Sequence, residues 1–153
     1  MNRSLLIVED DPEQLDALVR WFILAGYEVT GVDHPSQALE AASLRQFQVA
    51  LLDASLPEMD GLLLMQRLNL HQDGMQVIIL SGRDNLEQRA KTEGAFACLV
   101  KPCKLAMMQA TVEDAFEQAR DEWIAREQLT VGEETQVARP GSDRGMNRPL
   151  ARN

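Results

Sequence analysis

The chain has 153 residues, of which 25% are charged, and carries a formal net charge of −9. This length provides for one domain with a substantial core and not for two. The acidic balance argues against a nucleic-acid-binding surface, because such a surface needs clustered basic side chains to release the counterions of the phosphates.

Strand-like and helix-like patterns alternate along the first 120 residues. Short apolar runs predict strands, and apolar residues repeated every three or four positions predict helices. The predicted strand–helix pairs are 4–8 with 12–26, 27–32 with 35–44, 49–52 with 60–71, 75–80 with 84–93, and 96–100 with a helix from about 104. Five such repeats with short connections predict an α/β fold, a doubly wound parallel sheet of five strands.

Polar side chains follow four of the predicted strands at the point where each strand ends. The first strand stops at Glu9, Asp10 and Asp11, and the apolar run Val49–Leu52 stops at Asp53. The carboxyl ends of parallel strands share one edge of the sheet, where ligands bind in folds of this kind. Carboxylates gathered there repel one another and call for a cation, and hard oxygen ligands suit Mg²⁺.

Two further strand ends supply a hydroxyl and an ammonium group. The fourth strand ends at Ser81-Gly82, and the fifth ends at Lys101-Pro102. A metal-binding acid cluster, a nucleophilic carboxylate, a hydroxyl donor and a lysine are together the parts that phosphoryl transfer requires.

The motifs at these strand ends resemble those of response regulator receiver domains. They read IVEDD, LLDASLPEMDG, LSG and LVKP, in that order, within about residues 2–120. The resemblance implies a CheY-like, flavodoxin-like sheet with strand order 2-1-3-4-5. Helical periodicity continues beyond the resemblance and predicts a receiver domain over residues 2–129 with an extended last helix. The composition of residues 130–153, poor in apolar residues, predicts a disordered tail or linker.

The resemblance assigns a role to each site residue. Asp53 is the phospho-acceptor, Ser81 donates a hydrogen bond to the phosphoryl group, and Lys101 pairs with that group after a cis peptide bond to Pro102. The Mg²⁺ ion is held by Asp10 and Asp53 directly, by Glu9 through water, and by the backbone oxygen of Ser55. The backbone N–H groups of Ala54 and Gly82 are expected to contact the phosphoryl group.

Two positions depart from the usual family pattern. Cys98 stands where an aromatic switch residue is common, and Cys103 stands where Phe commonly follows Lys-Pro. Phe96 is predicted on the same side of the strand as Cys98 and is the one candidate to replace the aromatic residue. With no second cysteine pair for zinc, both cysteines are interpreted as free thiols. These departures affect signal transmission and leave the phosphorylation chemistry intact.

The leading hypothesis is a phosphorylation-dependent switch rather than an enzyme with a separate substrate. A sensor histidine kinase or phosphotransfer protein is the expected donor, and a downstream protein target, an output domain or a second copy is the expected receiver of the signal through the last two helices and last strand. The alternative is a receiver-fold interaction module that works without phosphate. A third reading, an aspartate-nucleophile hydrolase, lacks the second acid that such enzymes carry where this chain has Ser55.

The sequence also predicts where the protein works. No stretch approaches the ~20 apolar residues of a membrane span, and the N-terminal apolar run is too short for a signal peptide. A soluble, cytoplasmic protein with no membrane partner and no direct nucleic-acid binding is expected.

Overall fold

The computed structural model describes residues 3–147, with side chains for residues 3–83 and 85–129. The chain divides into one compact unit that ends at Arg120 and another that starts at Asp121. The elements follow in the order β1 Ser4–Val8, α1 Pro12–Leu24, β2 Glu28–Val32, α2 Pro35–Leu44, β3 Val49–Asp53, α3 Gly61–His71, β4 Gln76–Ser81, a 3₁₀ turn Asp84–Leu86, α4 Glu87–Thr92, β5 Ala97–Val100 and α5 Leu105–Asn147.

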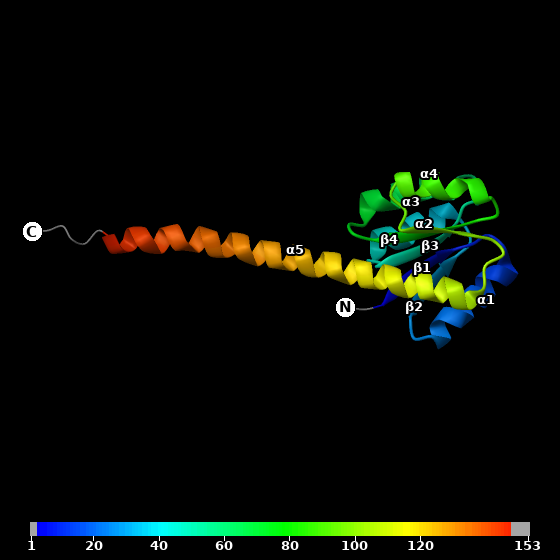
Figure 1. Cartoon of the computed structure of the whole chain (residues 1–153), viewed down its shortest axis with the longest axis horizontal. Helices are drawn as coiled ribbons and strands as arrows, with labels where there is room; N and C mark the ends of the chain where they lie inside the picture. Colours follow the sequence, from blue (N-terminus) through cyan, green and yellow to red (C-terminus); the bar gives the residue numbers. More distant parts are fainter. Residues whose placement is uncertain (1–2, 148–153) are drawn as a thin grey trace, which may run out of the picture. The chain divides into compact units, whose positions relative to one another are not determined.

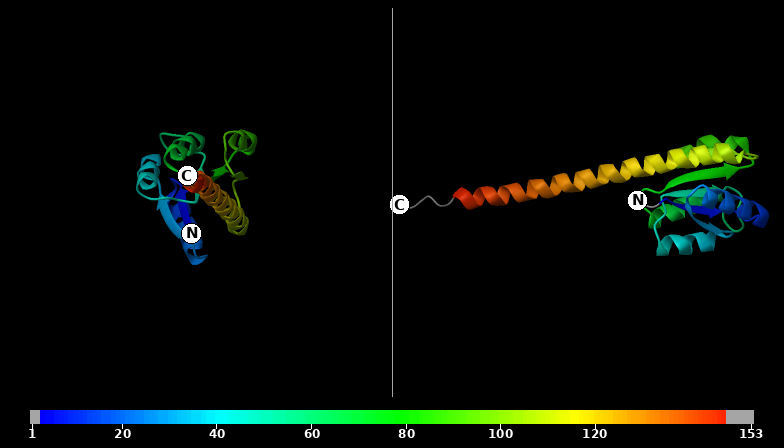
Figure 2. Two further views of the ribbon diagram at one scale, coloured as in Figure 1. Left: turned by 90° about the vertical axis from the view of Figure 1, so that its left-hand side faces the viewer. Right: turned by 90° about the horizontal axis from the view of Figure 1, so that it is seen from below.

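The five strands form one parallel sheet in the order β2-β1-β3-β4-β5, which confirms the order expected from the resemblance. Every residue of β1 and β3 is buried, as predicted for central strands covered on both faces, whereas β2 at one edge is partly exposed. Helices α2, α3 and α4 lie over one face of the sheet, and α1 and the first turns of α5 lie over the other (Figures 1 and 2).

Two apolar cores separate the helices from the sheet. The core beneath α2, α3 and α4 contains side chains from alternate strand positions, including Leu6, Leu52 and Ile79. The opposite core, beneath α1 and α5, takes the intervening positions, such as Ile7 and Leu51. This alternation fixes which side chains face each helix layer, and it leaves the strand ends to define the site.

The helix starts agree closely with the sequence. The Asp11 carboxylate accepts hydrogen bonds from the backbone N–H groups of Glu13 and Gln14 and so caps α1 in front of Pro12. Asp60 likewise caps α3 by accepting from the N–H of Leu63. Asp11 lies shortly after the end of β1, and Asp60 lies at the end of the loop from β3 to α3, so each cap begins the helix that follows a strand of the site.

The end of the chain differs from the predicted tail. The backbone of α5 is helical to Asn147, although a disordered tail is expected from Thr130, and residues 148–153 lie outside the described residues. The prediction of disorder depends on low apolar content, which bears on core burial and does not by itself exclude a helix. The residue types do not explain a helix here, because the stretch contains Pro140, Gly132, Gly141 and Gly145. The division at residue 129 into a receiver domain and a linker stays a prediction.

Candidate phosphoryl-transfer site

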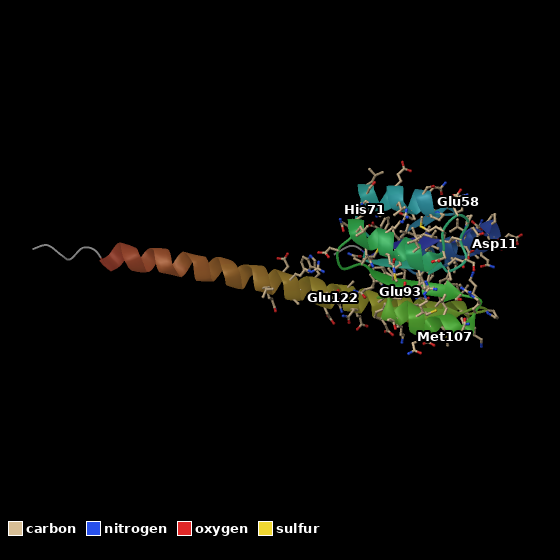
Figure 3. The ribbon with its side chains drawn as sticks, turned by 90° about the horizontal axis from the view of Figure 1, so that it is seen from above. Asp11, Glu58, His71, Glu93, Met107 and Glu122 are labelled. Carbon is tan, nitrogen blue, oxygen red and sulfur yellow. The ribbon has the colours of Figure 1, made fainter. Side chains whose placement is uncertain are left out.

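The candidate site lies at the carboxyl ends of the central strands. Figure 3 shows Asp11, which follows β1, and Glu58, in the loop after β3, at the same end of the first unit. Because β1 and β3 are neighbours in the sheet, with Val8 opposite Leu52, the residues that follow them are brought side by side. The predicted meeting of the first and third strand ends is therefore present.

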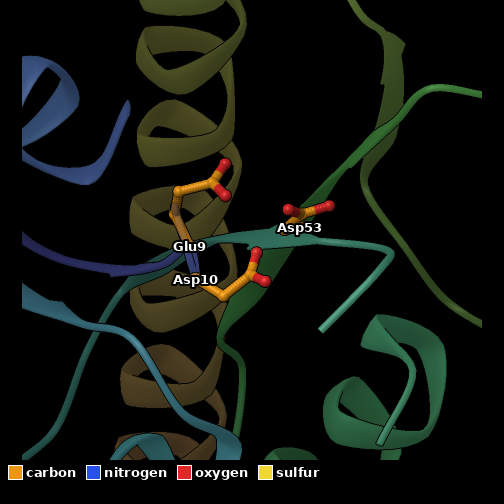
Figure 4. A group of neighbouring side chains, drawn as sticks. All are labelled: Glu9, Asp10 and Asp53. Carbon is orange, nitrogen blue, oxygen red and sulfur yellow. The ribbon is translucent and has the colours of Figure 1, made fainter. Parts of the chain in front are cut away.

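Three carboxylates converge at this edge. Glu9 and Asp10 follow β1, and Asp53 is the last residue of β3 (Figure 4). Among the described residues, these are the one group of three potential metal ligands, with one ligand atom from each within 4.8 Å of the others. Glu9 is 2% exposed and Asp53 is 5% exposed, while Asp10 faces solvent.

Lys101 reaches the same group from the end of β5. Its Nζ lies 3.2 Å from Glu9 Oε1 and 3.2 Å from Asp53 Oδ2, so one ammonium bridges two carboxylates. The Lys101–Pro102 peptide bond is cis, which confirms the expectation from the resemblance.

The electrostatics of the group show an excess of negative charge. Burial, with the hydrogen-bonded and negatively charged Asp53 beside it, raises the pKa of Glu9 from 4.5 to about 7, although Lys101 and the backbone N–H of Asp11 act in the opposite direction. Burial alone would lower the pKa of Lys101, but Asp53 and Glu9 outweigh it and raise that pKa above its ordinary value. One lysine therefore does not balance the acids.

The donor set fits a divalent cation of the Mg²⁺ type. All three side chains are carboxylates, the ligands that hard cations prefer, and neither cysteine lies among them. When all three carboxylates are ionised, the one ammonium leaves two uncompensated negative charges, which a divalent ion would neutralise. The structure thus fits divalent-metal binding, as the sequence predicts.

The turn after β3 holds a local contact of the Asp53 carboxylate. The backbone N–H of Ser55 donates to Asp53 Oδ1 at 3.0 Å. The N–H of Ala54, which is expected to contact the phosphoryl group, instead donates to the carbonyl of Leu80 at 2.8 Å. An Asx turn after a strand-end aspartate is a common local arrangement and is the signal that would have singled out the N–H of Ser55.

Ser81 is buried at the end of β4 and is engaged locally. Its Oγ donates to the carbonyl of Arg83 at 3.1 Å and accepts from the N–H of Arg83 at 2.9 Å. Gly82, the other predicted contact from this loop, is exposed and lines a hollow of about 400 Å³ together with Arg83, Asn85 and Val100. In this structure the hydroxyl is therefore bound to its own turn.

Cys98 is buried on the α4 side of β5, at 7% exposure, and packs in the core beneath α2, α3 and α4. Burial, with a smaller contribution from Glu87, raises the pKa of its thiol. Phe96 packs in the opposite core, so the prediction that it shares a side with Cys98 is wrong. The reason is that β5 begins at Ala97, one residue later than predicted, and strand alternation does not extend back to Phe96.

Comparison with known proteins agrees with this geometry. The response regulator receiver domain family matches residues 5–113. The chain belongs to this family. Among solved structures, the CheY-like response regulator receiver domain protein from Methanospirillum hungatei JF-1 is 27% identical, has a TM-score of 0.74, and matches over 80% of this chain and 99% of its own.

Two curated relatives of this receiver domain are transcriptional regulators. The phosphoglycerate transport system transcriptional regulatory protein PgtA of Salmonella typhimurium is 31% identical over 127 residues, which are 82% of this chain and 30% of PgtA. The transcriptional activator protein PfeR of Pseudomonas aeruginosa is 36% identical over 118 residues, which are 76% of this chain and 38% of PfeR. The receiver domain thus spans about a third of the length of these relatives.

Within the part of the chain that the structure describes, no helix combines the length and the apolar character needed to cross a membrane.

Proposed function

We propose that this receiver domain is a Mg²⁺-dependent phospho-accepting switch. It takes a phosphoryl group from a sensor histidine kinase or phosphotransfer protein onto Asp53, and the modification changes the affinity of the α4-β5-α5 face for a protein partner. The observation that carries this proposal is the buried Asp53 carboxylate, placed between two other acids and the ammonium of Lys101 at the sheet edge.

The transfer step forms one bond and breaks one. A carboxylate oxygen of Asp53 attacks the phosphorus of the phosphohistidine, and an O–P bond replaces the P–N bond. The electron pair of the P–N bond returns to the imidazole, which leaves as neutral histidine after taking up a proton. The chain itself supplies the nucleophile and the groups that orient it, so it promotes its own modification and has no separate substrate.

The acids around Asp53 supply the metal site. Asp10, Asp53 and the carbonyl oxygen of Ser55 would hold a Mg²⁺ ion directly, and Glu9 would hold one of its water molecules. When bound, the ion supplies positive charge that offsets the repulsion between the Asp53 carboxylate and the oxygens of the incoming phosphoryl group. Glu9 and Asp10 thereby allow a charged nucleophile to persist in a buried position.

Donors from three loops stabilise the transferred group. Lys101 already lies 3.2 Å from Asp53 Oδ2 and can turn to a phosphoryl oxygen without leaving the site. The N–H of Ser55 faces the same carboxylate. Ser81 and Ala54 differ, because their donors are occupied by the carbonyls of Arg83 and Leu80 in this structure.

The engagement of Ser81 gives the switch its physical basis. To donate to a phosphoryl oxygen, the Ser81 hydroxyl must release the carbonyl of Arg83, and the turn that precedes α4 is then free to rearrange with Gly82. Helix α4 is six residues long, and its one buried side chain is Ala90, so few contacts oppose its movement. Phosphorylation shifts this equilibrium by as much as it favours the rearranged state.

The proposed setting is the cytoplasm, with a histidine kinase or phosphotransfer protein as donor. The receiver of the signal is a downstream protein, an output domain or a second copy of the chain. One observation favours a second candidate function, a receiver-fold module that binds its partner without phosphate. Cys98 is small and already buried, so the face beside it lacks an aromatic residue that changes position on activation.

Intact-mass measurement tests the two functions. The protein is incubated with acetyl phosphate and Mg²⁺, and a gain of one phosphoryl group is expected. The gain should be absent in Asp53→Asn and in the presence of a chelator, but retained in Asp60→Asn, in which asparagine preserves the helix cap. No gain in the wild-type protein under any condition would favour the phosphate-independent module.

A further inference from the structure

Gly61, the first residue of α3, is seated directly against the main chain of Asp53. A methyl group built on Gly61 would lie 2.4 Å from the carbonyl oxygen of Asp53, 3.1 Å from its carbonyl carbon and 2.9 Å from Cα of Ala54. Ordinary contacts of this kind are 3.4–4 Å. Because all three neighbours are backbone atoms, no side-chain rotation can relieve the overlap.

The need for glycine at this position is steric. Among the described glycines, a positive φ occurs at Gly26, Gly74 and Gly94 and not at Gly61, so backbone conformation alone would permit other residues there. The backbone N–H of Gly61 also donates to the carbonyl of Ala54 at 2.9 Å, which closes the loop between β3 and α3. The close approach and the hydrogen bond together hold the start of α3 against the main chain of Asp53 and Ala54.

The main-chain segment against which Gly61 packs contains residues of the site. Asp53 ends β3, and the next two residues provide the hydrogen bond from Ala54 to Leu80 and the one from Ser55 N–H to Asp53 Oδ1. Any displacement of the Asp53–Ala54 peptide therefore moves both the carboxylate and the N–H that orients it. Relief of a 2.4 Å contact requires a shift of about 1 Å, and misplacement of that size can cost about a hundredfold in rate.

We propose that Gly61 is a positioning residue for phosphoryl transfer. Its missing side chain lets the start of α3 lie against Asp53, and this seat sets the position of the carboxylate and of the main chain of Ser55. The inference rests on the proposed role of Asp53 as phospho-acceptor, and it adds a residue that touches neither the phosphoryl group nor the metal.

Another closely packed glycine provides a matched control. A methyl group on Gly31, in β2, would lie 2.6 Å from Val19 Cγ2 and 3.2 Å from Leu15 Cδ1, which are side-chain ends on α1. Gly31→Ala therefore also crowds a packed glycine, but away from the site.

The experiment compares Gly61→Ala, Gly31→Ala and wild type. Phosphorylation by acetyl phosphate is followed by intact mass at a temperature at which denaturant curves show each variant folded, and the Mg²⁺ dependence of the rate is recorded. In the folded protein, Gly61→Ala is expected to lower the rate of phosphorylation by about ten- to a hundredfold. It is also expected to raise the Mg²⁺ concentration at which that rate is half-maximal. The control Gly31→Ala should stay within about twofold of wild type in both quantities, because loss of stability alone moves neither of them in a folded protein.

The outcomes separate the two levels of inference. If the wild-type protein is phosphorylated and Gly61→Ala is phosphorylated no more slowly than Gly31→Ala, the positioning role is overturned and the proposed function stays intact. Wild type that takes up no phosphoryl group overturns both. Should Gly61→Ala be unfolded, the comparison is repeated in trimethylamine N-oxide, which favours the folded state. If the variant still does not fold there, the glycine serves folding alone and the positioning role is rejected.

Discussion

The site edge contains two regions that are built in different ways. The acidic centre, formed by Glu9, Asp10, Asp53 and Lys101, is joined by contacts between residues far apart in the sequence, such as Lys101 to Glu9. In the switch region, formed by Ser81, Gly82, Arg83 and Cys98, the Ser81 hydroxyl is hydrogen-bonded to the backbone of Arg83, two positions later in the chain. The acidic centre is therefore held by tertiary contacts, whereas the Ser81 turn is held by local hydrogen bonds.

This difference separates chemistry from transmission. Moving the acidic centre would require the sheet or the loops after three strands to move, so its geometry exists before any phosphoryl group arrives. Opening the Ser81 turn costs local hydrogen bonds alone, each worth about 1 kcal/mol in net stability. A modest differential interaction with a phosphoryl group is therefore enough to rearrange the switch region while the acidic centre stays in place.

Lys101→Met breaks the acidic centre most severely. Methionine keeps much of the side-chain volume but removes the ammonium that lies 3.2 Å from Asp53, a donor already aimed at the reacting position. We expect the rate of phosphorylation by acetyl phosphate to fall by about 10²–10³, the loss typical of one preorganised donor. Time courses by intact mass measure this, with Lys104→Met as control because Lys104 is exposed on the same loop. Equal losses in both variants would contradict the arrangement.

Asp10→Asn tests the metal side of the acidic centre. Removing one of three clustered carboxylates should raise the Mg²⁺ concentration for half-maximal phosphorylation roughly tenfold or more. Asp11→Asn is the matched control, since asparagine caps α1 as well as aspartate does and the charge lost is one residue away. The metal assignment fails if Asp11→Asn shifts the Mg²⁺ dependence as much as Asp10→Asn.

The strands and helices of the fold could be predicted from the sequence because apolar patterning and polar strand ends agree at every repeat. The runs at 4–8 and 49–52 are apolar throughout and become the fully buried central strands. The strand order came from the family resemblance, since periodicity does not determine which strands are neighbours. The largest departure is the helix from Thr130 to Asn147, where composition predicts disorder.

Within the site, side-chain identities were predictable and hydrogen-bond partners were less so. Glu9, Asp10, Asp53 and Lys101 meet as expected. The engagement of the Ala54 N–H with Leu80 depends on the exact register between β3 and β4, which residue types do not specify. The wrong side assigned to Phe96 has a similar cause, because a one-residue error in the start of β5 changes which core a flanking side chain enters.

Glu9→Gln tests the excess negative charge of the acidic centre through the pH dependence of stability. The pKa of Glu9 is raised from 4.5 to about 7 in the folded protein, so folding favours its protonated form. In chelator, the stability linked to this proton is present below pH 4.5 and is lost as pH rises to about 7. We expect the denaturation midpoint of wild type to fall across this window relative to that of Glu9→Gln. If the denaturation midpoints of the two proteins change with pH in parallel, the pKa of Glu9 is not raised by folding.

Cys98→Phe probes the switch region, and its expected effect is the smallest. Cys98 is 7% exposed and packed beneath α4, so an aromatic ring requires neighbouring groups to move. Overpacking of this kind typically lowers the free energy of unfolding by about 1–3 kcal/mol. Cys103→Phe is the control: Cys103 is half-buried beside a hollow of about 300 Å³ lined also by Leu18 and Met108, and its change should stay within about 0.5 kcal/mol.

Chemical denaturation of both cysteine variants decides how tightly the switch region is built. A loss confined to Cys98→Phe means that the space beneath α4 is filled by the native side chains, and that signalling cannot depend on a large ring entering it. If Cys98→Phe is as stable as wild type, α4 moves aside at little cost. The switch region would then accommodate an aromatic residue, and the small side chain at position 98 would cease to distinguish a phosphate-independent module from a switch.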